Sequence, residues 1–148
     1  MKPHLRVLAI GASVAIGLIL AGIATAGVSG AHFVGTPTVE VAGNTVTLSG
    51  KVAGLGNVEQ IHVEVSADVR CVNPGQNKPK AANKQTVGAG DDFPVQNGKA
   101  EFELTLTATF QPDCTPPMTL EWTNIQILVT APGVRLTHQE PGPFVTSG

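Results

Sequence analysis

The chain has 148 residues, of which nine are lysine or arginine and eleven are aspartate or glutamate. This length gives room for one domain. The formal net charge of −2 argues against a nucleic-acid-binding protein, because such proteins need a basic surface for phosphates.

The first 26 residues read as a helical secretory signal peptide. A short basic start with Lys2, His4 and Arg6 precedes an apolar stretch at 7–23, and small residues follow at 24–26. This order is typical of a cleaved signal. A retained membrane anchor is the alternative, but the apolar core is short for a span of about 20 residues and is interrupted by glycines.

Cleavage would remove Lys2 and Arg6, so that seven basic residues remain against eleven acidic ones and the net charge becomes −4. We therefore expect a secreted or extracellular protein, or one held in the cell envelope. Its contact with a membrane would be made only through the signal segment before cleavage.

The remaining chain shows strand patterns in chain order at 38–41, 45–52, 58–69, 93–95, 99–110, 119–131 and 134–138. In 99–110 large apolar side chains alternate with Glu and Thr, which indicates a strand with one buried face. Asn97-Gly98 predicts the hairpin turn before it. The alternation in 119–131 breaks near 123–124, which predicts a β-bulge.

These short strands, separated by Gly/Pro turns, predict an all-β fold, an antiparallel immunoglobulin-like β-sandwich of about seven strands. We expect a flexible segment at 27–35, the sandwich at 36–139 and a tail at 140–148. Trp122 follows both cysteines. The Cys–Trp–Cys order of true immunoglobulin domains is therefore absent, and the prediction concerns architecture rather than membership.

Four sequence segments carry a resemblance. GKVAGLGN (50–57), CVNPG (71–75), PVQNGKA (94–100) and QPDCTPPMT (111–119) resemble segments of small exported bacterial β-sandwich proteins of uncharacterised function. The resemblance covers most of the mature chain. It implies export and a β fold, and it implies nothing about chemistry.

Cys71 and Cys114 are the two cysteines of the chain. An even number of cysteines in an exported protein favours a disulfide. Each cysteine follows a long predicted strand, and we expect the two strands to run in the same direction. The bond would then tie the irregular stretch 73–92 to the proline-rich loop 111–118. The polar residues of this end form a candidate binding loop: Asn73, Asn77, Lys78, Lys80, Asp91 and Asp92.

Metal chemistry is weakly indicated. His62 and Glu64 lie two residues apart on one strand face and are weak candidate ligands, but a closed zinc site needs about four. Asp91, Asp92 and Asp113 offer oxygen ligands without the spacing of a calcium loop. We interpret these residues as solvent-facing positions and expect no cofactor.

The sequence contains no Gly-x-Ser-x-Gly element and no convincing Ser/His/Asp set. We therefore expect a secreted, non-enzymatic β-sandwich protein that has a binding role, or an envelope or matrix role, toward an unknown extracellular or envelope partner. One alternative is a subunit of an extracellular assembly joined by strand addition. The other is a metal-dependent or hydrolytic enzyme whose site is assembled from loops.

Overall fold

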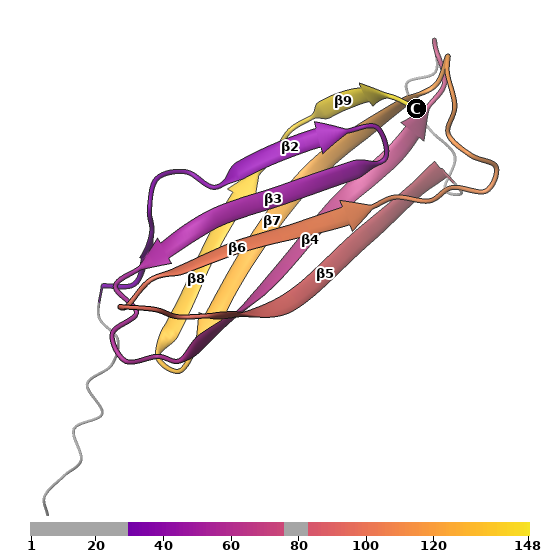
Figure 1. The fold of residues 1–148 in the computed structure, drawn as a ribbon. Helices are drawn as coiled ribbons and strands as arrows, with labels where there is room; N and C mark the ends of the chain where they lie inside the picture. The colour runs from indigo at the N-terminus through magenta and orange to yellow at the C-terminus, as the bar shows by residue number, and fades with distance from the viewer. Residues whose placement is uncertain (1–29, 76–82) are drawn as a thin grey trace, which may run out of the picture.

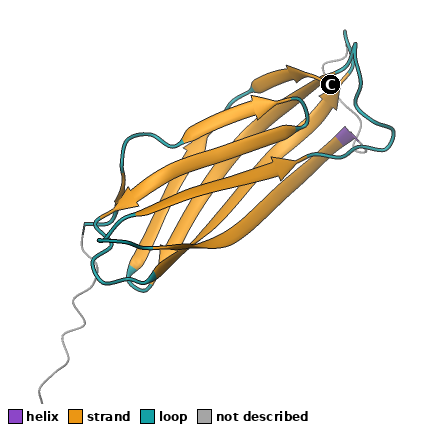
Figure 2. Cartoon of the chain, in the orientation of Figure 1, coloured by secondary structure: helices purple, strands orange, loops and turns teal. Residues whose placement is uncertain are grey.

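The computed structural model describes residues 30–75 and 83–148. The predicted signal segment 1–26 lies outside the described residues, as do Asn77, Lys78 and Lys80 of the candidate binding loop. The described chain consists of strands joined by loops and turns, apart from a very short helical segment just before β5, as Figure 2 shows. Within this part of the chain, no helix is long and apolar enough to cross a membrane.

Nine strands are present in the described residues, and they form two antiparallel sheets (Figure 1). The four-stranded sheet, called sheet A below, contains β1, β2, β3 and β6. The five-stranded sheet, sheet B, contains β4, β5, β7, β8 and β9. The bounds are β1 His32–Phe33, β2 Thr38–Ala42, β3 Thr45–Ala53, β4 Gln60–Val72, β5 Lys84–Pro94, β6 Ala100–Thr107, β7 Thr119–Ala131, β8 Val134–Glu140 and β9 Phe144–Ser147.

One strand lies at the centre of sheet A and two lie at the centre of sheet B. In sheet A, β1 and β2 pair with successive stretches of one edge of β3, and β6 pairs with its other edge. In sheet B, the order is β5-β4-β7-β8, and β9 pairs with the part of β7 that β8 leaves free. The all-β prediction is confirmed, and the arrangement is consistent with a sandwich.

The hydrophobic core lies between the two sheets, because alternate residues of the long strands face inward. In β4 every second residue from Ile61 to Cys71 is buried. Trp122, the one tryptophan of the chain, is completely buried, and its indole Nε1–H has no hydrogen-bond partner among the described residues. The largest fully buried side chains are Trp122, Leu48, Leu55, Ile61, Leu106, Leu120, Ile125 and Ile127.

The turn and the bulge occur where the sequence predicts them. Asn97 and Gly98 both have positive φ, 52° and 74°, and Gln96 pairs with Lys99 across them. In β7, the pairing with β4 shifts so that Asn124 and Ile125 together oppose Ala67. Asn124 has φ 51°, a conformation that asparagine tolerates better than most residues. The bulge lets both Trp122 and Ile125 face the core.

An aromatic row crosses the core near the start of β6. The Phe33 and Phe93 rings pack edge-on against Phe102, with centroids 6.5 and 6.2 Å apart. Gly50 lies opposite Phe102 in the β3–β6 ladder, and a Cβ on Gly50 would lie 2.6 Å from Phe102 Cζ. The glycine therefore makes room for the ring that joins the two sheets at this end.

A Cys71–Cys114 disulfide lies at the other end and joins residues 43 apart in sequence. Figure 1 shows β4 and β6 running in the same direction, as predicted, so the loops that follow them meet. Met118 contributes a third sulfur atom, 3.5 Å from Cys71 Sγ. The predicted pairing is confirmed.

Three segments differ from the sequence prediction. Much of the stretch 73–92, predicted as irregular, belongs to β5, and the segments predicted as a flexible start and a tail contain β1 and β9. The β5 sequence has glycines at 88 and 90 and low apolar content, so its propensity for strand is weak. Its ladder with β4 runs from Gln60↔Pro94 to Arg70↔Lys84 and supplies backbone hydrogen bonds. β5 therefore forms although its own sequence does not predict a strand.

We predict that the disulfide is a major stabilising element. Replacing both Cys71 and Cys114 with serine should lower the free energy of unfolding by about 4 kcal/mol, because the bond closes a long loop in the unfolded chain. Guanidinium denaturation measures the change, and reduction of the unaltered protein should reproduce it. An unchanged denaturation midpoint, or two free thiols in the unreduced protein, would contradict this assignment.

Candidate functional site

The candidate binding-loop residues fall into two separate places. Asn73 follows β4 at the disulfide end, whereas Asp91 and Asp92 lie in β5 beside Val63 and His62, near the start of β4. Cys71 lies nine residues after His62 on β4, which corresponds to roughly 30 Å of extended strand. The prediction that Asp91 and Asp92 belong to a loop at the disulfide end is therefore wrong, because β5 carries them to the opposite end.

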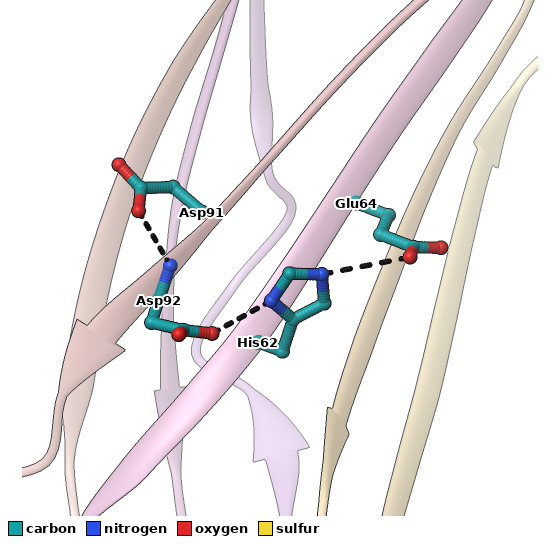
Figure 3. A network of polar contacts seen from close by, with 4 residues as sticks. All are labelled: His62, Glu64, Asp91 and Asp92. Carbon is teal, nitrogen blue, oxygen red and sulfur yellow. Dashed lines mark hydrogen bonds and ion pairs between the residues drawn. The ribbon is translucent and has the colours of Figure 1, made fainter.

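His62 is the centre of a polar network on the outer face of sheet B, which Figure 3 shows. The His62 imidazole lies between two carboxylates: Nδ1 is 2.6 Å from Asp92 Oδ1, and Nε2 is 3.5 Å from Glu64 Oε1. Asp91 accepts a hydrogen bond from the backbone N–H of Asp92 at 2.8 Å. We call these four residues the His62 network.

The register of the sheet explains this geometry. His62 pairs directly with Asp92 across the β4–β5 ladder, and Glu64 lies two residues along β4 on the same face. Glu64 pairs with Gly90. A Cβ on Gly90 would lie 3.4 Å from His62 Nε2 and 3.5 Å from Glu64 Cγ. The absence of a side chain at Gly90 thus leaves space for both groups to lie over β5.

The carboxylates favour the charged form of the imidazole. The hydrogen bond to Asp92, supported by the charges of Asp92 and Glu64, raises the pKa of His62 above 6.5, although partial desolvation opposes the shift. The His62 side chain is 42% exposed. The network therefore presents a histidinium to solvent over a wider pH range than an isolated histidine would.

A shallow depression of about 470 Å³ adjoins the His62 network. Its floor is formed by Gly88 and Gly90 of β5, where the outer face carries no side chains. We call it the glycine depression. The side chains that surround it come from β4 and β7, and they are His62, Glu64, Ser66, Gln126 and Leu128.

A second polar group stabilises the same face toward the disulfide end. Asp68 accepts hydrogen bonds from the Thr86 hydroxyl at 2.6 Å and the Asn124 amide at 2.9 Å. These bonds, first that from Asn124 and then that from Thr86, lower the pKa of Asp68. Asp68 thereby joins β4 to both of its neighbours and holds the bulge at Asn124.

The arrangement orients an imidazole, but among the described residues no hydrogen bond joins His62 to a hydroxyl or thiol, although Thr130 of β7 lies directly opposite it in the β4–β7 ladder. Ser66 lies four residues from His62 on the same strand face, roughly 13 Å away. His62 Nε2 faces Glu64 instead. Asp113 precedes Cys114 at the disulfide end, so the structure separates it from Asp91 and Asp92. Among the described residues, no group of three or more His, Cys, Asp or Glu side chains could hold a metal ion.

Sequence reasoning singled out His62, Glu64, Asp91 and Asp92 but did not bring them together. It missed Gly88, Gly90, Gln126 and Leu128. The available signal was the spacing of the two glycines, which places both on one face of any strand that contains them. This spacing predicts a shared face only if the segment that contains the two glycines, β5, is recognised as a strand.

Comparison with protein-family models, with curated proteins and with solved structures returns no match. Any functional assignment therefore rests on the geometry and the sequence of the chain itself.

We predict a pH dependence of stability that comes from His62. A pKa raised in the folded state contributes stability that is fully present below the unfolded pKa, near 6.5, and is lost as the pH rises through the folded pKa. The difference in melting temperature between the unaltered protein and His62→Gln should therefore shrink as the pH rises above neutrality.

The matched control is His32→Gln, since the His32 imidazole contacts the Gly30 carbonyl rather than a carboxylate. Asp92→Asn should reduce the His62 pKa in an NMR titration. A His62 pKa at or below 6.5 in the unaltered protein would contradict the assignment.

Proposed function

We propose that this chain is an exported, non-enzymatic β-sandwich protein with an immunoglobulin-like strand order, which binds a partner outside the cell or in the envelope. Its binding surface is the outer face of sheet B around the glycine depression. The observation that carries the proposal is the His62 network, in which charged side chains are held in place beside a hollow free of side chains.

The strand order supports the immunoglobulin-like description. In immunoglobulin domains the first, second and fifth strands share one sheet, and the third, sixth and seventh share the other. From β2 onward, this chain places β2, β3 and β6 in sheet A and β4, β7 and β8 in sheet B. The strand between the third and the fifth, β5, joins the edge of β4 rather than that of β6.

Two features support export. The basic start, the apolar stretch 7–23 and the small residues 24–26 have the order of a secretory signal. The Cys71–Cys114 disulfide is the kind of bond that forms and persists in oxidising compartments.

The His62 network supports binding better than catalysis, because its side chains are already held in place by contacts with one another. Asp92 fixes one imidazole nitrogen and Glu64 faces the other, and within the part of the chain that the structure describes no hydrogen bond joins the imidazole to a hydroxyl or thiol. Preoriented polar groups lose little conformational entropy when a partner docks, which improves affinity. Leu128 adds an apolar contact at the edge of the hollow.

We predict that the exported protein begins at Gly27. Intact mass spectrometry of protein recovered from the culture medium and from the envelope measures the start. Ala26→Arg should block processing, since small residues are required at the cleavage site. A full-length chain in the membrane fraction would show instead that the segment is an anchor.

We predict that filling the glycine depression abolishes partner binding without unfolding the protein. A Cβ at Gly88 would meet only the Val65 carbonyl oxygen, at 3.4 Å, and the position is exposed, so Gly88→Phe should fold. The matched control is Thr38→Phe, which places the same ring at an exposed position of β2, in the other sheet. The measurement is retention of envelope components on the immobilised protein.

The expected result is loss of retention with Gly88→Phe and full retention with Thr38→Phe, with neither melting temperature lowered. Equal retention by all three proteins would place the binding surface elsewhere, and turnover in a hydrolase panel would overturn the non-enzymatic assignment.

A further inference from the structure

The glycine depression has an available hydrogen-bond acceptor at its rim. The Glu64 side chain is 61% exposed, and among the described residues its one ion-pair partner is His62, whose Nε2 lies 3.5 Å away. This separation is longer than that of a usual N–H···O hydrogen bond. Asp92 Oδ1, by contrast, is already engaged with His62 Nδ1 at 2.6 Å. The Glu64 carboxylate can therefore accept hydrogen bonds from a further group.

The register of the sheet places small residues beside this carboxylate. Glu64 pairs with Gly90 across the β4–β5 ladder. The next outward residue of β4, Ser66, lies between Gly88 of β5 and Gln126 of β7. The depression thus extends from β5 across Ser66 to β7. Its volume of about 470 Å³ is in the range of small-molecule sites, so the depression accommodates one long side chain of a partner.

The charges around the depression favour a cationic ligand. Glu64 and His62 line it, and Asp91 and Asp92 complete the His62 network (Figure 3). Three carboxylates outnumber the single imidazole, so the network is negative whether or not His62 carries the additional proton. The whole chain is also acidic, with a formal net charge of −2. Charge complementarity at an interface therefore selects a positive group for this place.

We propose that the glycine depression receives an arginine side chain of a partner protein, and that protonation of His62 weakens the binding of this cation. The proposal rests on the function proposed above and names the group that binds there. A guanidinium offers parallel N–H groups that match both oxygens of the Glu64 carboxylate, whereas a lysine ammonium acts as a point charge.

The other side chains around the depression suit the rest of an arginine. Leu128 provides an apolar contact for the methylene stem, as long cationic side chains require. The Ser66 hydroxyl and the Gln126 amide offer acceptors for N–H groups that Glu64 does not bind. The site therefore combines a carboxylate, neutral acceptors and an apolar rim.

His62 controls the availability of Glu64 through its Nε2 atom. When the imidazole is charged, Nε2–H faces the Glu64 carboxylate, and an arriving guanidinium meets a like charge. When the imidazole is neutral, Asp92 holds the remaining proton on Nδ1, and Glu64 loses its cationic neighbour. The hydrogen bond to Asp92 raises the pKa of His62 above 6.5. Arginine binding should therefore strengthen as the pH rises through that pKa.

The pH switch depends on His62 rather than on a neighbour. The charged groups around the imidazole are Glu64 on its own strand, Asp91 and Asp92 on β5, and Arg135 on β8. Arg135 pairs with Thr130 of β7, which itself pairs with His62, so Arg135 is two strands away. Among these types of side chain, histidine is the one whose charge ordinarily changes near neutral pH.

The first test is an NMR titration of the exported protein with Nα-acetylarginine amide at about pH 8. We expect saturable shifts of the Glu64, Gly88 and Gly90 amide signals. The citrulline derivative has nearly the same shape without the charge, and it should cause no such shifts. The lysine derivative and glucosamine should bind more weakly. Equal binding of the citrulline derivative, or tighter binding of either amine, would overturn the assignment to arginine.

A matched pair of variants tests the role of Glu64. Glu64→Gln should weaken binding of the arginine derivative about fivefold, the loss expected for one exposed ion pair. The control is Glu103→Gln, which makes the same change at an exposed position of β6 in the other sheet and should bind as the unaltered protein does. Equal affinities of all three proteins would overturn the proposed site.

The pH switch has its own test. The unaltered protein should bind the arginine derivative about fivefold more tightly at about pH 8 than at about pH 5.5. His62→Gln should bind it equally at both pH values, whereas His32→Gln should keep the unaltered ratio. By linkage, saturation with the arginine derivative should lower the pKa of His62. A pH ratio that persists in His62→Gln, or a pKa of His62 that binding leaves unchanged, would overturn the switch.

Competition separates the ligand class from the proposed function. The arginine or the citrulline derivative is added to immobilised protein that has retained envelope components. Release by the arginine derivative alone supports the proposal. Retention that survives Gly88→Phe contradicts the proposed function itself. Retention that requires the open depression but resists the arginine derivative overturns only the assignment to arginine.

Discussion

The register between β4 and its two neighbours is the constraint on which the rest of the structure depends. β4 is paired on both sides along most of its length, and its side chains alternate between the core and the outer face. A shift of one residue would exchange the two faces and expose Val63 while burying His62. The same alternation that builds the core therefore also builds the polar face, and neither can change without the other.

β7 meets this constraint through its bulge. Its apolar residues change phase between Trp122 and Ile125, so a regular strand would turn one set away from the core. The extra residue at Asn124 corrects the phase, and the Asn124 side chain bonds to Asp68 on β4. The bulge in β7 is thus stabilised by β4, the strand with which β7 pairs. The side-chain hydrogen bonds on the outer face link three strands of sheet B.

The sequence predicts well the elements whose pattern is local. The strands around Val63, Phe102 and Ile127 carry their own alternation, the turn at Asn97 carries its own chemistry, and the cysteine pairing follows from strand direction. β5 is different, because Gly88 and Gly90 give it little preference, and it becomes a strand through its ladder with β4. The His62 network is hard to predict for the same reason. His62 and Asp92 are 30 residues apart in sequence, and only the β4–β5 ladder brings His62 Nδ1 to 2.6 Å from Asp92 Oδ1.

The glycine depression has an evolutionary consequence. Glycine in a strand interior costs roughly 0.5–1 kcal/mol relative to alanine, and a Cβ at Gly88 or Gly90 would meet neighbouring atoms no closer than 3.4 Å. Selection for stability alone would therefore tend to replace both glycines and close the hollow. A lineage that relies on the hollow would retain them at the expense of stability, whereas a lineage that has lost its partner would accumulate β-branched residues there. Under the proposed function, sequence change at these two positions would thus record the history of binding separately from the history of the fold.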